Sequence, residues 1–186
     1  MIRLWRVFPR IAAAEAPGHG HPLWFPRELQ GAGRHDNPDL YGAMYVSEVA
    51  VAAVAEPIAH LRGQRLEDAD LERAGIRLAL VSLDAAIDGR LWDLDDPRVL
   101  LERNLRPSQV ATRFREQTRR QAADLFRARP SRDGLRWWSA LEASWINVTL
   151  FERAARRLFV AAPPEPLNLV HPVVREAAAV LGMSIR

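Results

Sequence analysis

The sequence predicts an α+β fold, because strand-like and helix-like segments are mixed along the chain without the regular alternation of a doubly wound sheet. Its 186 residues, of which 48% are hydrophobic and 26% charged, are typical of a soluble globular protein with its own core. No internal repeat, low-complexity tract or long linker divides the chain. We therefore expect residues 1–186 to form a single domain.

Three segments of the first half have the length and residue types of short strands. They are Leu4–Phe8, Ala43–Ser47 and Ile76–Leu83. The segment Ala12–Pro26 is rich in proline and glycine, so we expect a loop between the first two strands.

Two helices are expected between the second and third of these strands. Ser47 can cap a helix that starts at Glu48, where an acidic side chain favours the positive end of the helix dipole. Pro57 should kink or end this helix, because its ring clashes with the preceding turn. A short polar helix over 65–75 should stop at Gly75.

The second half is expected to contain three helices and three strands, with a turn at Pro130–Gly134. In the longest helical segment, larger side chains recur every three or four residues. We expect its many arginines to form a solvated face rather than a track for phosphates. The helices are Asp96–Arg103, Pro107–Arg127 and His171–Leu181, and the strands are Leu135–Ser139, Asn147–Glu152 and Arg157–Ala161.

The composition excludes several kinds of chemistry. Without cysteine the chain has no disulfide, no Cys-ligated zinc and no thiol nucleophile. All 26 basic residues are arginines, yet the net charge is only +3, so we interpret this usage as compositional bias rather than as a sign of nucleic-acid binding. The longest apolar run, Val49–Ala55, is too short to span a bilayer, and arginines interrupt the N-terminus. We expect a cytoplasmic protein.

The usual catalytic motifs are missing from the sequence. It contains no phosphate loop, no His-Glu-x-x-His zinc helix and no Gly-x-Ser-x-Gly elbow, and Gly31-Ala32-Gly33 is only a fragment of a dinucleotide fingerprint. No metal is expected, because the pair His19 and His21 reads as part of an exposed loop. From the residues alone, Tyr45 reads first as a core aromatic. Glu56 is as compatible with a surface position on a short helix as with a site.

Two longer strings resemble the signatures of the RES domain family, which is named for an Arg, a Glu and a Ser. GAGRHDNPDLYGAMYVSEVAVAAVAE, residues 31–56, resembles the first signature, and DGLRWWSALEASWINVTLFE, residues 133–152, resembles the second. The opening LWRVF resembles the family's first strand, so the likeness covers essentially the whole chain. His35 stands where many members have Trp or Phe, and Ala140 follows the serine where Arg is common, which leaves substrate preference open.

The resemblance implies an ADP-ribosyltransferase-like fold with a split, mostly antiparallel sheet. It also implies that NAD is the substrate and that its nicotinamide–ribose bond is cleaved, with water or inorganic phosphate as acceptor and without a metal. Carried over by position, the catalytic residues are Glu56, Arg34 and Ser139, and the NAD-binding residues are Arg6, Arg34, Tyr45 and His35.

The chemistry of NAD cleavage fits these residue types. The departing nicotinamide leaves a positive, oxocarbenium-like ribose, which the Glu56 carboxylate would stabilise while its apolar neighbours exclude water. Arg34 and Arg6 can each grip the pyrophosphate with two hydrogen bonds.

The remaining residues have less definite roles. Tyr45 can stack on the nicotinamide. Ser139 can hydrogen-bond the carboxamide or a ribose hydroxyl, and it is not assigned as a nucleophile because no base for it is evident. His35 either contacts a phosphate or has a structural role.

The resemblance further implies a toxin whose NAD cleft is blocked by an Xre-type antitoxin. No membrane is expected as partner, nucleic acid is not expected for this chain alone, and a homodimer is left open. One alternative is a mono-ADP-ribosyltransferase that modifies a protein target. A second is a non-catalytic module that binds nucleic acid or protein, through the arginine-rich face of residues 113–129 in the case of nucleic acid.

Overall fold

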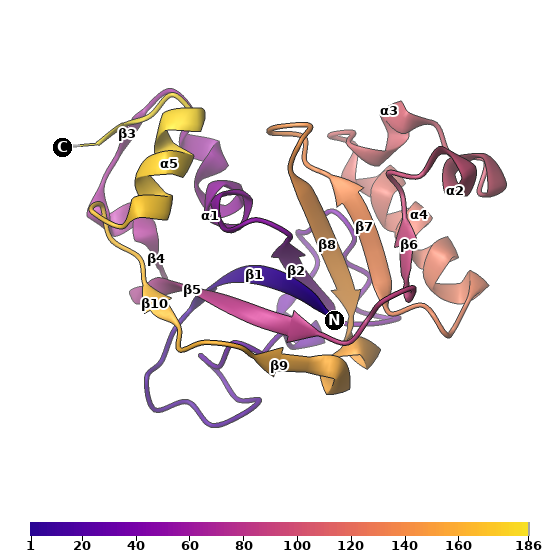
Figure 1. The fold of residues 1–186 in the computed structure, drawn as a ribbon, viewed down its shortest axis with the longest axis horizontal. Helices are drawn as coiled ribbons and strands as arrows, with labels where there is room; N and C mark the ends of the chain where they lie inside the picture. The colour runs from indigo at the N-terminus through magenta and orange to yellow at the C-terminus, as the bar shows by residue number, and fades with distance from the viewer. Residues whose placement is uncertain (186) are drawn as a thin grey trace. The chain divides into compact units, whose positions relative to one another are not determined.

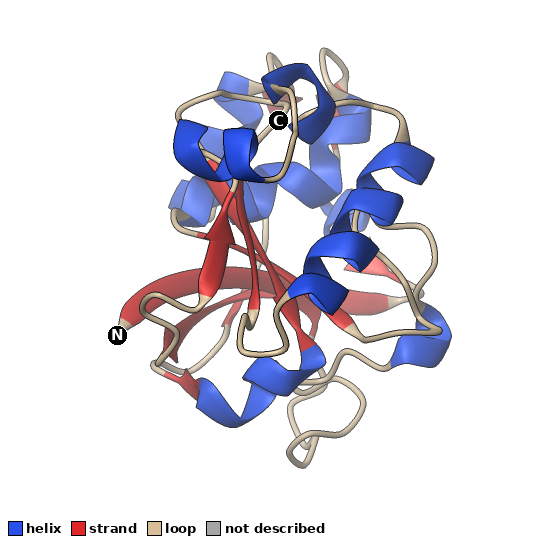
Figure 2. Cartoon of the chain, turned by 90° about the vertical axis from the view of Figure 1, so that its right-hand side faces the viewer, coloured by secondary structure: helices blue, strands red, loops and turns tan. Residues whose placement is uncertain are grey.

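The computed structural model describes residues 1–185 and has an α+β fold with mostly antiparallel strands, as the sequence predicts (Figures 1 and 2). The chain forms two compact units. The first unit comprises residues 1–2, 25–46 and 85–158, and the second comprises residues 3–24, 47–84 and those from 159 onward. That residues 1–186 form a single domain stays a prediction.

The first unit contains a sheet covered by short helices. Trp92, Leu135 and Trp137 of the strands share a core with Leu100 and Leu125 of the helices. The neighbouring strands are, in order, β2 (Ala43–Ser47), β8 (Ile146–Phe151), β7 (Gly134–Trp138) and β6 (Leu91–Asp93), with β7 antiparallel to β8 and parallel to β6. The helices are α2 (Pro97–Glu102), α3 (Pro107–Val110) and α4 (Arg115–Ala128).

The second unit combines strands around β5 with a pair of helices, α1 and α5, which lie side by side (Figure 1). Trp5 of β1 pairs with Ser47, the last residue of β2. The strands that pair with β5 (Ile76–Ala85) are β1 (Ile2–Pro9), β4 (Glu72–Arg73), β9 (Leu158–Val160) and β10 (Glu165–Pro166). The helices are α1 (Ala50–Ile58) and α5 (Pro172–Val180), and β3 (Arg65–Leu66) pairs with β11 (Ser184–Ile185).

The longer strands and two of the helices confirm the sequence prediction to within about two residues, the usual uncertainty of element ends. Helix α2 begins as expected, because the Asp96 carboxylate accepts the Arg98 backbone N–H at 2.9 Å. The His171 side chain caps α5 in the same way. The strands β6, β10 and β11 were not predicted, since each has only two or three residues.

The predicted start of α1 is wrong. Ser47 does not cap this helix, because it is buried in β2 opposite Trp5, and α1 begins at Ala50 after Val49. Pro57 lies in the last turn of α1, which ends one residue later at Ile58. Strand pairing therefore decides where the helix begins, and the proline agrees with the predicted end.

Two further helix predictions need correction. The segment 65–75 forms β3, a 3₁₀ helix at Asp68–Leu71 and β4, because its acidic side chains bond to nearby backbone N–H groups and β4 pairs with β5. The segment 107–127 is interrupted between α3 and α4. Arg34 donates there to the carbonyls of Val110 and Thr112, which a continuous helix would use internally.

One buried carboxylate connects three segments of the first unit. Asp133, which precedes β7, has a side chain only 1% exposed and accepts hydrogen bonds from Arg90 and, at 3.0 Å, from Nε of Arg157. Its backbone N–H donates to the Arg90 carbonyl at 2.7 Å, and its carbonyl accepts from Phe151 at 2.8 Å.

No helix of residues 1–185 is both long and apolar enough to cross a bilayer.

We expect Asp133→Ala to lower the free energy of unfolding by about 3 kcal/mol, because it leaves two arginines without their buried counter-charge. Urea denaturation followed by tryptophan fluorescence measures this. Glu116→Gln is the control: that carboxylate is 87% exposed in its pair with Arg120, so its loss should cost less than about 1 kcal/mol. Equal midpoints for the two variants would contradict the assigned role of Asp133.

Candidate functional site

The glycine-rich loop of the first signature folds around a carboxylate. Asp36, which is buried, accepts the backbone N–H groups of Gly31 at 2.8 Å and Gly33 at 2.7 Å. It also accepts the hydroxyl proton of Tyr45 in β2 at 2.7 Å. Gly33 must be a glycine, because a Cβ at this position would overlap with the Asp36 carboxylate and the Tyr45 hydroxyl.

Arginines of α4 hold the outer side of the same loop. Arg115 donates to the carbonyl of Ala32 at 2.7 Å, and Nε of Arg119 donates to the carbonyl of Gly33 at 3.0 Å. Arg115 is exposed, as expected for a solvated arginine face, whereas Arg119 is partly buried against the loop. The expectation also holds for Arg120, which is 74% exposed.

Arg34 lies at the end of this loop and is partly buried. Its Nη1 donates to the carbonyls of Val110, at 3.4 Å, and Thr112. Its Cζ lies 4.9 Å from the ring centroid of Trp137 in β7, a cation–π contact. The backbone and the indole thus fix the direction of this guanidinium.

His35 is buried beneath the loop. Its Nδ1 is 2.8 Å from the Thr149 hydroxyl. The centroid of its ring lies 5.2 Å from that of the Trp137 ring, and the two planes are nearly perpendicular. Burial, and then the charge of Arg34, lower the pKa of His35 to about 3, so the imidazole is neutral at physiological pH. With an exposed fraction of 2%, His35 fits the structural alternative better than contact with a phosphate.

Tyr45 and Ser139 both make local hydrogen bonds. The Tyr45 hydroxyl accepts the His35 backbone N–H at 2.8 Å, and burial followed by the Asp36 charge raises the pKa of Tyr45 well above its usual range. Ser139 is buried directly after β7, where its hydroxyl accepts the Leu141 N–H at 3.1 Å. These bonds hold the phenol in place and stabilise the turn after β7.

The predicted residues Glu56 and Arg6 belong to the second unit. Glu56 is exposed on α1, although Val54, Ala55 and Ile58 are buried, so the expectation that apolar neighbours exclude water from it is wrong. Arg6 donates to backbone carbonyls of the 10–24 loop, including that of Trp24 at 2.8 Å. Burial lowers the pKa of Arg6 to about 10, which leaves it cationic at neutral pH.

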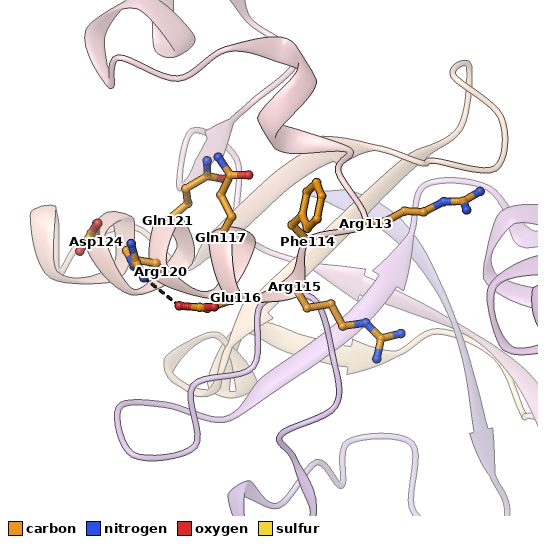
Figure 3. Close-up of a pocket in the computed structure, with 8 residues that line it drawn as sticks. All are labelled: Arg113, Phe114, Arg115, Glu116, Gln117, Arg120, Gln121 and Asp124. Carbon is orange, nitrogen blue, oxygen red and sulfur yellow. Dashed lines mark hydrogen bonds and ion pairs between the residues drawn. The ribbon is translucent and has the colours of Figure 1, made fainter.

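An open groove runs along α4 (Figure 3). Phe114, 75% exposed, points to the same side as Gln117 and Gln121. None of the predicted site residues lines this groove, so it does not mark the site that the sequence predicts.

Among residues 1–185, no three His, Asp or Glu side chains gather so as to hold a metal ion.

Comparison with known proteins identifies the family. The family model described as RES domain matches residues 3–170, which is most of the chain. The chain belongs to the RES domain family. No curated protein matches it significantly. A chain of the crystal structure of the M. tuberculosis MbcT–MbcA toxin–antitoxin complex has a similar fold, with a TM-score of 0.62 and 16% identity over 96% of this chain and 89% of that one.

In this RES domain, the structure brings Arg34, His35 and Tyr45 together, and Ser139 follows Trp137 by two residues. Sequence reasoning missed Asp36 and Thr149, whose side chains bond to these residues. An aspartate three residues after Gly33 is a signal for Asp36, since such side chains often bond to nearby backbone N–H groups. No local pattern identifies Thr149, because it is 114 residues from His35.

Gly33→Ala tests the close packing of the RES loop. We expect it to lower the free energy of unfolding by about 1–3 kcal/mol, as overpacking does, because the loop, Asp36 and Tyr45 would have to move apart. The control is Ala32→Ser, which adds one atom at the exposed neighbouring position. Thermal unfolding measures the effect, and the prediction fails if both variants have the melting temperature of the wild-type protein.

The low pKa of His35 predicts acid sensitivity. The unfolded chain takes up a proton near pH 6.5 and the folded chain only near pH 3, so stability held above pH 6.5 is lost as the pH falls between these values. His35 should contribute about 1.4 kcal/mol per pH unit to that loss. Urea titrations measure the free energy of unfolding between pH 7 and 5. This free energy should fall less steeply with pH in His35→Gln than in the wild type or in His60→Gln, the control at an exposed histidine. Identical dependence of the free energy of unfolding on pH in all three proteins would contradict the role assigned to His35.

Proposed function

We propose that this RES domain degrades NAD by cleaving the bond between nicotinamide and ribose, and that it is the toxin of a toxin–antitoxin pair. The main support is the family match over residues 3–170. By their resemblance to the family's signatures, the two strings would place Arg34, Glu56 and Ser139 at the positions of its Arg, Glu and Ser. The similar fold in a toxin–antitoxin complex agrees with this proposal.

In the proposed reaction, the electrons of the glycosidic bond leave with neutral nicotinamide, and the ribose becomes an oxocarbenium-like cation. A water oxygen then bonds to the anomeric carbon and releases a proton, which gives ADP-ribose; phosphate in place of water gives ADP-ribose 1″-phosphate. Glu56 is the proposed electrostatic centre, because a fixed carboxylate stabilises the developing positive charge. Its exposure on α1 leaves it accessible to a ligand.

Two residues of the first unit have proposed binding roles. Arg34 would contact the pyrophosphate, since a guanidinium has five N–H groups in a rigid fork that matches phosphate oxygens. Tyr45 would present its ring to the nicotinamide. In the second unit, Arg6 is proposed as a further phosphate ligand.

An NAD-degrading toxin would harm its own cell. We therefore propose an Xre-type antitoxin as partner and the cytoplasm as the place of action. The same catalytic groups would also serve a mono-ADP-ribosyltransferase, because only the acceptor differs. Product analysis separates these reactions.

The decisive experiment incubates the purified protein with NAD, with and without phosphate and with a cell lysate, and identifies the products by mass spectrometry. We expect free nicotinamide with ADP-ribose or, when phosphate is present, its 1″-phosphate. ADP-ribose attached to a lysate protein would favour the transferase. NAD that stays intact in all three mixtures would overturn the proposed function.

Glu56→Gln should reduce the rate of NAD loss by at least about 100-fold, the effect of removing one preorganised electrostatic group. The fold should remain, because the side chain is exposed. Glu176→Gln on α5, an exposed helical carboxylate, is the control and should retain the wild-type rate. An active Glu56→Gln protein would show that Glu56 is not catalytic.

A further inference from the structure

We propose that Asp36 is a positioning residue of the NAD site and acts through Tyr45 and the loop that leads to Arg34. This inference rests on the proposed function and adds a residue to the family's named Arg, Glu and Ser. The carboxylate is only 5% exposed, and it accepts three hydrogen bonds. Its partners are Gly31 and Gly33, which precede Arg34 in the chain, and Tyr45 itself.

The two carboxylate oxygens have separate tasks. Oδ2 accepts the N–H groups of Gly31 and Gly33, which sets the path of the backbone into Arg34. Oδ1 accepts the proton of Tyr45, which sets the position of the ring on β2. A change at this one carboxylate therefore displaces a proposed phosphate ligand and a proposed nicotinamide contact together.

The hydrogen bonds also decide what Tyr45 can offer a substrate. Its hydroxyl accepts the His35 N–H and donates its only proton to Asp36. That proton is therefore not available to a ligand or to a leaving group. Tyr45 is left with the face of its ring, which suits stacking on a planar, cationic nicotinamide.

A role in stability alone predicts a different outcome from a positioning role. If Asp36 only stabilised the loop, its variants would lose folded protein, and the remaining folded molecules would bind NAD normally. If it positions Tyr45 and Arg34, folded variants should bind NAD more weakly. The effect on the chemical step should be smaller, because a carboxylate that is only 5% exposed and acts through other residues would not itself contact the reacting atoms.

The test compares Asp36→Asn with Asp39→Asn, an exposed carboxylate in the same segment. The asparagine oxygen can still accept glycine N–H groups, but its NH₂ cannot accept the Tyr45 proton. For Asp36→Asn we expect KM for NAD to rise about tenfold, as for the loss of one hydrogen bond to a charged group, with a smaller fall in kcat. Asp39→Asn should keep the wild-type values, and circular dichroism confirms that each variant is folded.

Tyr45→Phe keeps the ring and removes the hydrogen bond to Asp36 from the other side, together with the bond that the hydroxyl accepts from the His35 N–H. This variant tests the positioning role even if Asp36→Asn does not fold. It should also raise KM, and adding Asp36→Asn to it should raise KM further by less than about threefold, since the two residues share one interaction. The positioning role alone would be overturned by a wild-type KM in folded Asp36→Asn or in Tyr45→Phe. It would also be overturned if adding Asp36→Asn to Tyr45→Phe raised KM by a further full tenfold. Wild-type protein that leaves NAD intact would overturn the proposed function and this inference with it.

Discussion

The glycine-rich loop that leads to Arg34 depends on the hydrogen bonds that converge on Asp36. Two glycine N–H groups point inward to its carboxylate, while the carbonyls of the same loop point outward to Arg115 and Arg119 of α4. Backbone groups that are removed from water need partners, and here both sides of the loop have them. The loop can therefore be held rigidly without belonging to a helix or a sheet.

Arginine side chains make many long-range hydrogen bonds in the first unit. Guanidinium groups donate to carbonyls of loops and helix ends, as Arg34 does to Val110 and Arg132 does to Leu91. A planar group with five donors suits this task better than a lysine ammonium, because it can satisfy several carbonyls at fixed angles. The arginine-only composition, interpreted from the sequence as bias, has thus acquired structural roles that net charge does not indicate.

The two signatures meet through a small buried cluster. Thr149 of β8 bonds to His35 of the first signature and accepts the indole N–H of Trp137 at 3.2 Å. Arg34 then lies over Trp137. The position of Arg34 consequently depends on residues more than 100 positions later in the chain, and the two strings act as one structural element.

The sequence by itself determined the α+β class, the longer strands, the capped helices α2 and α5 and the family, because each of these depends on neighbouring residues or on an ordered set of motifs. Only the tertiary structure decided the gap between α3 and α4, the start of α1, the burial of His35, the exposure of Glu56 and the hydrogen bonds of Asp36. Each of these depends on partners that are distant in the chain or on a backbone path that residue patterns do not specify. Periodicity records which face of an element is apolar, but it does not record which side chain from another element meets that face.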